Sequence, residues 1–199
     1  MSTLIREPVQ ERAIEKKKKI IEASYELFAE VGYYNTNTAE IAKRAGVSTG
    51  IVYGYFKDKR DILLEVLEIY IDNVYEPTLA MLEQITLPLN LEYIAPHVVE
   101  EAIKTHIKYA KIHETLHSLT SADSEVKKKF MELEDNITLK IADRFSQIGF
   151  VIADPYEKIH LIMNVVQSFA HEYVYDKHSY LDYDKMKKLV CANIIGLLR

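Results

Sequence analysis

Residues 113–117 read His-Glu-Thr-Leu-His, which satisfies the H-E-x-x-H pattern of zinc proteases. On a helix, His113 and His117 would share one face and could bind a metal ion, and Glu114 could act as a general base. No further histidine follows at short spacing with a glycine, so the pattern lacks the rest of a protease site. We keep a metal-dependent hydrolase as a distant alternative. We predict no catalytic residue, no resident metal and no other cofactor, and therefore a protein that is not an enzyme.

A second stretch, residues 36–56 (TNTAEIAKRAGVSTGIVYGYF), has the spacing of two short helices. Asn37 and Glu40 stand as the N-cap and N3 partners of a capping box. Gly46 can end the first helix, because glycine adopts the left-handed conformation without a Cβ clash. Ser48 is a natural cap for the second helix. Two short helices joined by a tight turn that contains glycine indicate a helix-turn-helix, whose second helix enters the major groove of DNA.

The side chains of this stretch suit contacts with DNA. Small residues open the second helix, so its backbone could approach a groove closely, and tyrosines and lysines further along could reach phosphates. The candidate DNA-binding residues are Thr36, Asn37, Thr38, Lys43, Arg44, Ser48, Thr49, Gly50, Tyr53, Tyr55, Lys57 and Lys59. From spacing alone, a helical corner of an ordinary domain stays an open alternative.

The elements around these residues are predicted to be helical. Apolar residues recur at steps of three and four, and no segment alternates with period two for long enough to predict a strand. The five clearest stripes lie in residues 20–31, 62–74, 126–148, 159–173 and 186–197, with Pro77 expected to kink the second. The sequence therefore predicts an all-α fold of about nine helices, in which a three-helix helix-turn-helix head precedes a helical-bundle body.

Composition limits the class of protein. The chain has 199 residues, of which 48% are hydrophobic, and this is typical of a globular protein rather than a disordered one. The single cysteine, Cys191, excludes an internal disulfide and a cysteine-rich zinc site. No apolar run is long enough for a membrane helix, and the first 19 residues lack the apolar stretch of a signal peptide. We expect a soluble, cytoplasmic protein without a membrane partner.

The formal net charge of −5 is unevenly distributed. Residues 1–60 hold eleven Lys and Arg against eight Asp and Glu, a net charge of +3, whereas residues 61–199 carry −8. This asymmetry favours a head that contacts nucleic acid. The run Lys16–Lys19, with Arg12 before it, allows two interpretations: an arm near DNA, or the solvated first turn of a helix. On a helix the four lysines spread around the axis, so they cannot all face one phosphate strand.

The stretch from Ile20 to Leu67 resembles the DNA-binding head of the tetracycline-repressor (TetR/AcrR) family of transcriptional regulators. The residues that carry the resemblance are the Ile20–Phe28 helix, Gly32, Tyr33, Thr36, Ile41, Ala42, Ala45–Ser48, Gly50, Val52, Tyr53, Tyr55, Phe56, Lys59 and Asp61–Leu63. The family often has Thr where this chain has Asn37, which also caps a helix. The resemblance implies a homodimer that binds a palindromic operator in double-stranded DNA, usually represses, and is released by a small molecule bound in the body.

The resemblance also implies that the last two long helices, at about 155–198, form a four-helix dimer interface. Both are apolar over a wide arc, so each must be buried on more than one side. The alternative is that both sides are buried within one monomer.

An effector pocket is expected between about Asp61 and Phe150, with a contribution from the eighth helix. Its candidate lining residues are Tyr70, Met81, Tyr93, His106, Tyr109, His113, His117, Met131 and Phe169. This mixture suits an apolar cavity with a few polar anchors, and it equally suits an ordinary core.

Together these observations predict a sequence-specific transcriptional regulator, a repressor that a small-molecule effector releases from its operator. Residues 1–56 are expected to be the DNA-binding domain, and residues 57–199 the ligand-binding and dimerisation domain. The alternative within the same class is a DNA-binding regulator without a small-molecule effector, either an activator or a factor controlled by a protein partner.

Overall fold

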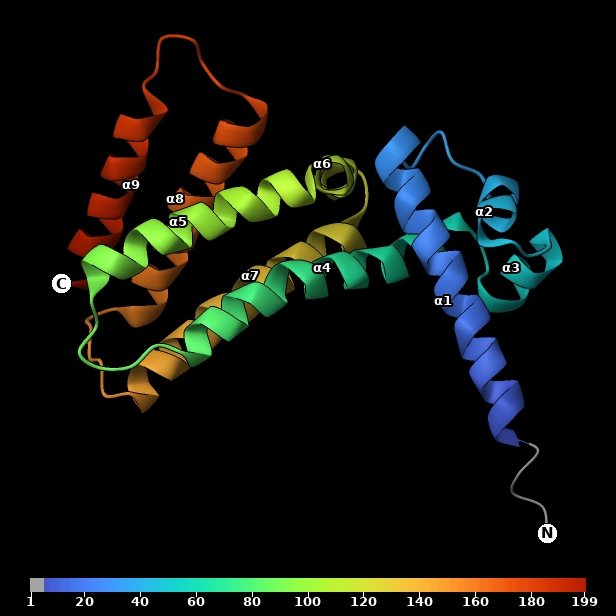
Figure 1. The fold of residues 1–199 in the computed structure, drawn as a ribbon, viewed down its shortest axis with the longest axis horizontal. Coiled ribbons are helices and arrows are strands. Elements are labelled where there is room, and N and C mark those ends of the chain that lie inside the picture. Colours follow the sequence, from blue (N-terminus) through green and yellow to red (C-terminus); the bar gives the residue numbers. More distant parts are fainter. Residues whose placement is uncertain (1–5) are drawn as a thin grey trace. The chain divides into compact units, whose positions relative to one another are not determined.

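The computed structural model describes residues 6–199, and all regular secondary structure in that range is helical (Figure 1). Its nine α-helices are α1 (Arg6–Val31), α2 (Thr38–Ala45), α3 (Thr49–Tyr55), α4 (Lys59–Glu83), α5 (Leu91–Lys108), α6 (Ala110–Ser118), α7 (Ser124–Gln147), α8 (Pro155–Tyr175) and α9 (Tyr183–Leu198), and a short 3-10 helix (Leu119–Ser121) follows α6. The prediction of an all-α fold with about nine helices is confirmed. Within this range no helix is both long and apolar enough to span a bilayer.

The described chain folds into two compact units. The first comprises the residues up to Asp72 together with Lys111–Val126, and therefore holds α1 to α3, the first half of α4, nearly all of α6 and the start of α7. The second comprises Asn73–Ala110 and Lys127–Arg199, and holds the rest of α4, α5, most of α7, α8 and α9. The division expected between residues 56 and 57 separates the chain by function rather than by compactness, and it stays a prediction.

The core of the first unit forms where the apolar stripes of its helices meet. Ile20 and Phe28 of α1, Val52 of α3 and Leu63 of α4 are at most 1% exposed. Burial of side chains of this size contributes about 1.5–3 kcal/mol each. The hydroxyl of Thr115 in α6 also donates a 3.1 Å hydrogen bond to the Phe28 carbonyl. The helix-turn-helix is therefore built on a core that includes residues far along the chain.

The core of the second unit lies between α5, α8 and α9, which pack against one another in pairs. Val99 of α5, Ala170 of α8 and Ile194 of α9 are buried at its centre. In Figure 1, α8 and α9 lie side by side. The apolar stripes that predicted these two helices are the faces that they bury.

The first helix is longer than its apolar stripe indicates. α1 begins at Arg6, whereas none of the described side chains from Glu11 to Lys19 is fully buried and Ile20 is the first that is. Lys16–Lys19 therefore lie in the middle of a helix, and the expectation of a first turn at these residues is corrected. Exposed turns of this kind gain stability from ion pairs four residues apart, and Glu15 and Lys19 form one at 2.8 Å.

Candidate nucleic-acid interface

The N-terminus of α2 is held by the predicted capping box. The side chain of Asn37 accepts hydrogen bonds from the backbone N–H groups of Ala39 and Glu40, both at 3.0 Å. In return, the Glu40 carboxylate accepts one from the Asn37 N–H at 3.2 Å. These bonds satisfy backbone donors that would otherwise have no partner at a helix start, so the first turn of α2 is fixed by local sequence.

The turn between α2 and α3 depends on Gly46. Its φ of +68° and ψ of +32° place it in the left-handed region, as predicted. The N–H of Val47 then donates to the Ala42 carbonyl at 3.0 Å, which closes the end of α2. This tight closure brings α3 directly against α2 and gives the helix-turn-helix its angle.

Ser48 precedes α3 with an extended backbone, at the N-cap position that the sequence predicted. Its side chain, however, makes no capping hydrogen bond to the helix. The Ser48 hydroxyl is exposed beside the start of α3. It is therefore available to a molecule that approaches this end of the helix.

Two glycines, Gly50 and Gly54, lie inside the seven residues of α3. Glycine inside a helix costs about 0.5–1 kcal/mol relative to alanine. A Cβ at Gly50 would touch only the Ser48 hydroxyl, at an ordinary 3.9 Å, and a Cβ at Gly54 would meet nothing within 4 Å. Neither glycine is required by backbone conformation or by packing inside the protein. The exposed face of α3 therefore has no side chain at these two positions.

Tyr53 is also exposed on α3, whereas the neighbouring Val52 is buried. Tyr53 is 54% exposed, and its hydroxyl shares a 3.0 Å hydrogen bond with the Thr38 hydroxyl in the first turn of α2. The bond holds the tyrosine across the two helices. Tyr55, by contrast, is half-buried.

Three predicted contact residues have their polar groups engaged within the protein. Thr36 is buried, and its hydroxyl donates to the Gly32 carbonyl at 2.9 Å. The Lys59 ammonium donates to the carbonyls of Tyr33 and Thr36, both at 2.6 Å, and burial lowers the pKa of Lys59. Arg44 makes the third set of internal contacts.

The Arg44 guanidinium bonds Glu30 through two nitrogens, at 2.8 and 3.1 Å, and Glu26 at 3.1 Å. These carboxylates raise the pKa of Arg44, and in turn Arg44 lowers the pKa of Glu30. The interaction joins the end of α2 to the end of α1. Sequence spacing identifies Glu26 and Glu30 as one face of α1, but it does not indicate their partner in another helix.

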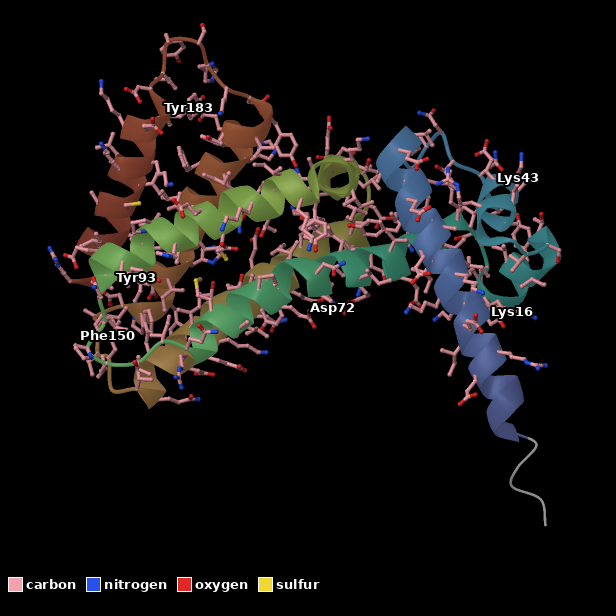
Figure 2. The ribbon with its side chains drawn as sticks, in the orientation of Figure 1. Lys16, Lys43, Asp72, Tyr93, Phe150 and Tyr183 are labelled. Carbon is pink, nitrogen blue, oxygen red and sulfur yellow. The ribbon has the colours of Figure 1, made fainter. Side chains whose placement is uncertain are left out.

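The remaining predicted cations lie on the surface. Lys43 (labelled in Figure 2) and Lys57 are exposed, and neither forms an ion pair with any described residue. They flank α3 in sequence on either side. Together with Thr38, Ser48, half-buried Thr49, Gly50 and Tyr53, they leave a surface with hydroxyl donors, two positive charges and no obstructing side chain at the glycines, which suits a phosphate backbone and a groove.

The predicted pocket residues are divided between the two units. Tyr70, His113 and His117 belong to the first, and Met81, Tyr93, His106, Tyr109, Met131 and Phe169 to the second. Tyr93 and Met131 are more than half exposed, whereas Tyr70, His106 and Phe169 are buried. Phe169 lies in the core between α5, α8 and α9.

The H-E-x-x-H residues have contacts of their own. His113 Nδ1 shares a 2.6 Å hydrogen bond with the Tyr70 hydroxyl, and the rings of His113 and His117 stack with centroids 5.4 Å apart. Across residues 6–199, no cluster of three or more His, Cys, Asp or Glu side chains is arranged to hold a metal ion.

Residues 20–66, which span α1 to α4, match the family model described as bacterial regulatory proteins of the tetR family. Over this stretch the chain is similar to regulatory proteins of the tetR family. The resemblance drawn from the sequence is thereby confirmed over the helix-turn-helix.

Curated relatives agree with this assignment. The chain is 41% identical over 75 residues to the HTH-type transcriptional regulator HbdR of Aromatoleum sp., a match that covers 38% of this chain and 33% of that protein. It is 45% identical over 53 residues to the fatty acid metabolism regulator protein of Bacillus subtilis, which covers 27% of each. The matches thus span a third or less of these relatives' length. Their names are those of regulators rather than enzymes, as predicted.

Solved structures share the fold over nearly the whole chain. A putative TetR-family regulator from Mesorhizobium loti has a TM-score of 0.68 and 18% identity, and the match covers 94% of this chain and 96% of that one. A putative transcriptional regulator from Saccharomonospora viridis, solved in complex with choline, has a TM-score of 0.67 and 18% identity, with 90% and 95% covered. The tetR domain is therefore followed by a body of the same fold as in these proteins.

Proposed function

We propose that this chain is a homodimeric transcriptional regulator that binds an inverted-repeat operator through α2 and α3 and responds to a small-molecule effector in its body. The observation that carries the proposal is the exposed face of α3 in a tetR-family domain, where Gly50 and Gly54 leave open space that no packing requires. A DNA groove is a partner that would use this space, because a backbone without side chains can approach base edges and phosphates closely. Such a regulator acts in the cytoplasm, where its DNA is.

The DNA-contacting residues proposed on this surface are Thr38, Lys43, Ser48, Thr49, Gly50, Tyr53 and Lys57, with Asn37 at the helix start and Tyr55 beside them. Thr36, Arg44 and Lys59 would act by holding the helix-turn-helix in shape, since their polar groups are engaged within the fold. The candidate residues from the sequence thus fall into two groups: those that contact DNA and those that position the helix-turn-helix.

A dimer interface is proposed on α8 and α9. Leu161 of α8 is 48% exposed and Leu189 of α9 is 70% exposed, although both lie on helices whose other faces are buried. On α9, exposed Ala192 and Gly196 follow Leu189 at helical steps, and small residues allow helices to approach closely. A two-fold axis would pair this patch with its own copy, and a symmetric operator requires such an axis.

An effector site is proposed within the second unit. The hydroxyl of Tyr75, in the second half of α4, is buried without a hydrogen-bond partner among the described residues. A buried unsatisfied hydroxyl costs about 1–3 kcal/mol, which a polar group of a bound molecule would recover. The choline complex of one structural relative supports a ligand-responsive body. The sequence did not single out Tyr75, because nothing distinguishes it from the other 13 tyrosines.

For an effector to release the protein from DNA, its affinity for the DNA-free protein must differ from its affinity for the DNA-bound protein. An effector lowers operator binding only if it binds the DNA-free form more tightly than the DNA-bound form. Two recognition helices of a dimer must lie about 34–36 Å apart to enter successive major grooves, so a small change in spacing is sufficient to lose one half-site.

Selection from a random duplex library by the full-length protein tests DNA binding. We expect enrichment of an inverted repeat whose half-site centres lie about one helical turn, or a multiple of it, apart. The double variant Lys43→Gln/Tyr53→Ala, which changes only exposed side chains, should lose this enrichment. Failure of the wild-type protein to enrich any sequence would contradict the proposal.

Transcription from a promoter that carries the selected site separates a repressor from an activator. Thermal unfolding in the presence of a small-molecule library, with choline and fatty acids among its members, detects an effector because binding to the folded state raises the unfolding temperature. A hit must also weaken operator binding to support release. A protein that no library member stabilises would favour control by a protein partner.

A further inference from the structure

The N-terminal half of α1 lies outside the core of the helix-turn-helix. Residues 6–19 precede Ile20, the first fully buried residue among the side chains of α1 that the structure describes, and at 1.5 Å per residue they extend for about 20 Å. In Figure 1 this half of α1 continues beyond α2 and α3. The family model begins at residue 20 and so assigns nothing to this segment.

Lys17 shows where this segment lies relative to α3. Its ammonium bonds the Glu65 carboxylate of α4 at 2.6 Å and lies 5.7 Å from the centre of the Phe56 ring, directly after α3. Residue 17 is therefore level with the C-terminal end of α3. Residues on α1 before Lys17 lie beyond that end.

Two neighbouring lysines are neutralised within α1. Lys19 pairs with Glu15 at 2.8 Å, and Lys18 pairs with Glu22 at 3.7 Å. Pairs four residues apart stabilise an exposed helix by a few tenths of a kcal/mol each. These two lysines thus have a structural role that needs no partner outside the protein.

Arg12 and Lys16 differ from Lys17, Lys18 and Lys19 of the same helix. Both are exposed, and neither forms an ion pair with a residue whose side chain the structure describes. Glu15, three residues after Arg12, bonds Lys19 instead. Like charges four residues apart on a helix repel each other and destabilise it slightly. An anion held between Arg12 and Lys16 would reverse the sign of this interaction.

These two cations lie on the side of α1 that carries the helix-turn-helix. Glu30 and Glu26 of α1 bond Arg44 of α2, which identifies the stripe of α1 that faces α2. Steps of three and four residues continue this stripe from Glu26 through Ala23 and Lys19 to Lys16 and Arg12. Figure 2 shows the labelled Lys16 on the α3 side of α1.

We propose that Arg12 and Lys16 form a second DNA contact, a clamp for the phosphodiester backbone next to the groove that α3 enters. The clamp rests on the proposed function, because it extends the same interface. Arg12 can bond a phosphate with two N–H groups, and Lys16 adds a point charge one helical turn away. Contacts of this kind are independent of base sequence and set the salt dependence of binding.

The test compares Arg12→Gln, Lys16→Gln and the double variant with Lys18→Gln as the matched control. Lys18 is two residues from Lys16, so it carries the same charge on nearly the opposite side of the helix. Binding of the full-length proteins is measured from 50 to 300 mM KCl on the selected inverted repeat and on a scrambled duplex of equal length. Removal of one phosphate-binding cation reduces the slope of log K against log salt by about 0.9, which is about 1.8 per dimer for each substitution.

We expect the Arg12→Gln and Lys16→Gln slopes to fall on both duplexes, and the Lys18→Gln slope to equal that of the wild type. The Arg12→Lys/Lys16→Arg protein, which keeps both charges, should retain the wild-type slope. Equal slopes for Lys16→Gln, Lys18→Gln and wild type would overturn the clamp. A decrease of the slope on the selected inverted repeat alone, with no change on the scrambled duplex, would also overturn it. If the wild-type protein binds neither duplex, the proposed function itself has failed. Far-ultraviolet circular dichroism confirms that each variant keeps its helix content.

Discussion

At the scale of single residues, the proposed DNA-binding surface depends on two positions of α3 that have no side chain as well as on the side chains around them. α3 has seven residues, and two of them lack a side chain without any need inside the fold. A sequence under selection for stability alone would place alanine at both. The two glycines lower the stability of this helix, and their presence therefore indicates that they are kept for a function.

Gly50→Ala should change stability and DNA binding in opposite directions. We expect the free energy of unfolding to rise by about 0.5–1 kcal/mol, because alanine is the better helix former and the added Cβ meets only Ser48 at 3.9 Å. Operator affinity should fall about tenfold or more, because the methyl group separates α3 from the groove. Urea unfolding and fluorescence anisotropy measure the two effects. A variant that binds as tightly as the wild type would show that α3 does not approach DNA at Gly50.

Lys57 and Lys59 are two residues apart and should respond differently to substitution by methionine, which keeps the aliphatic stem. Lys59→Met removes the donor to two carbonyls, so we expect unfolding to become easier by about 1–3 kcal/mol. Lys57→Met should leave stability within about 0.5 kcal/mol and weaken DNA binding, since its ammonium is exposed. Urea denaturation compares the two proteins. Equal stability losses would contradict the distinction between a positioning lysine and a contact lysine.

At the scale of elements, one ion-pair group joins the starts of two helices within the first unit. Arg60, in the first turn of α4, bonds Asp123 through two nitrogens at 2.7 and 3.0 Å and Glu125 at 2.9 Å. Asp123 also accepts hydrogen bonds from the N–H groups of Glu125 and Val126 and so caps α7. The start of α4, which three residues separate from the end of α3, is thereby fixed to the start of α7.

This contact should make the free energy of unfolding depend on pH in the acidic range. The Arg60 guanidinium, with the two backbone N–H donors, lowers the pKa of Asp123 to about 2. Because the folded-state pKa is below the unfolded value, the contribution of Asp123 is full above about pH 4 and is lost as pH falls towards 2. Asp123→Asn, which can still cap α7, should therefore be less stable than the wild type at pH 7 by about 1 kcal/mol or less, and this difference should shrink towards zero as the pH falls to 2.

Urea unfolding at intervals between pH 2 and 7 measures this difference. Asp72→Asn is the control, since Asp72 is exposed on α4 and forms no ion pair with a described residue. A constant difference between Asp123→Asn and wild type across this range would show that the charge on Asp123 contributes nothing.

Local elements were predictable where neighbouring residues determine them. The Asn37–Glu40 capping box and the left-handed Gly46 lie where the sequence places them, because their partners are within four residues. Prediction was incomplete where partners are distant. Arg44 was assigned to DNA, but its guanidinium bonds Glu30, and the Lys59 ammonium bonds carbonyls 23 and 26 residues away. Charge type alone does not distinguish a cation that faces solvent from one that closes a fold.

At the scale of the whole molecule, the exposed apolar residues of α8 and α9 are the basis for proposing a dimer. Large apolar side chains exposed on otherwise buried helices are typical of an interface, whereas isolated ones are common on any surface. Leu161 and Leu189 are exposed on two helices that pack against each other, and a symmetric interface there would cover both side chains.

Leu189→Lys should dissociate the dimer. Burial of a lysine charge against its symmetric copy is unfavourable, so we expect a monomer at micromolar concentration by light scattering and at least a hundredfold loss of affinity for the inverted repeat. Val151→Lys is the control, because Val151 is 90% exposed and lies outside both helices. A variant that stays dimeric would place the interface elsewhere.

The sequence by itself determined the helical fold, the helix-turn-helix and the basic character of the head. These properties follow from apolar periodicity, from caps and turns within a few residues, and from charge counts, all of which are local. Only the tertiary structure decided which cations are engaged: Arg44 and Lys59 bond other parts of the first unit, whereas Lys43, Lys57, Arg12 and Lys16 do not pair with described residues. The reason is physical, since the partner of a charged group is chosen by proximity in space, and helices separated by many residues bring those partners together.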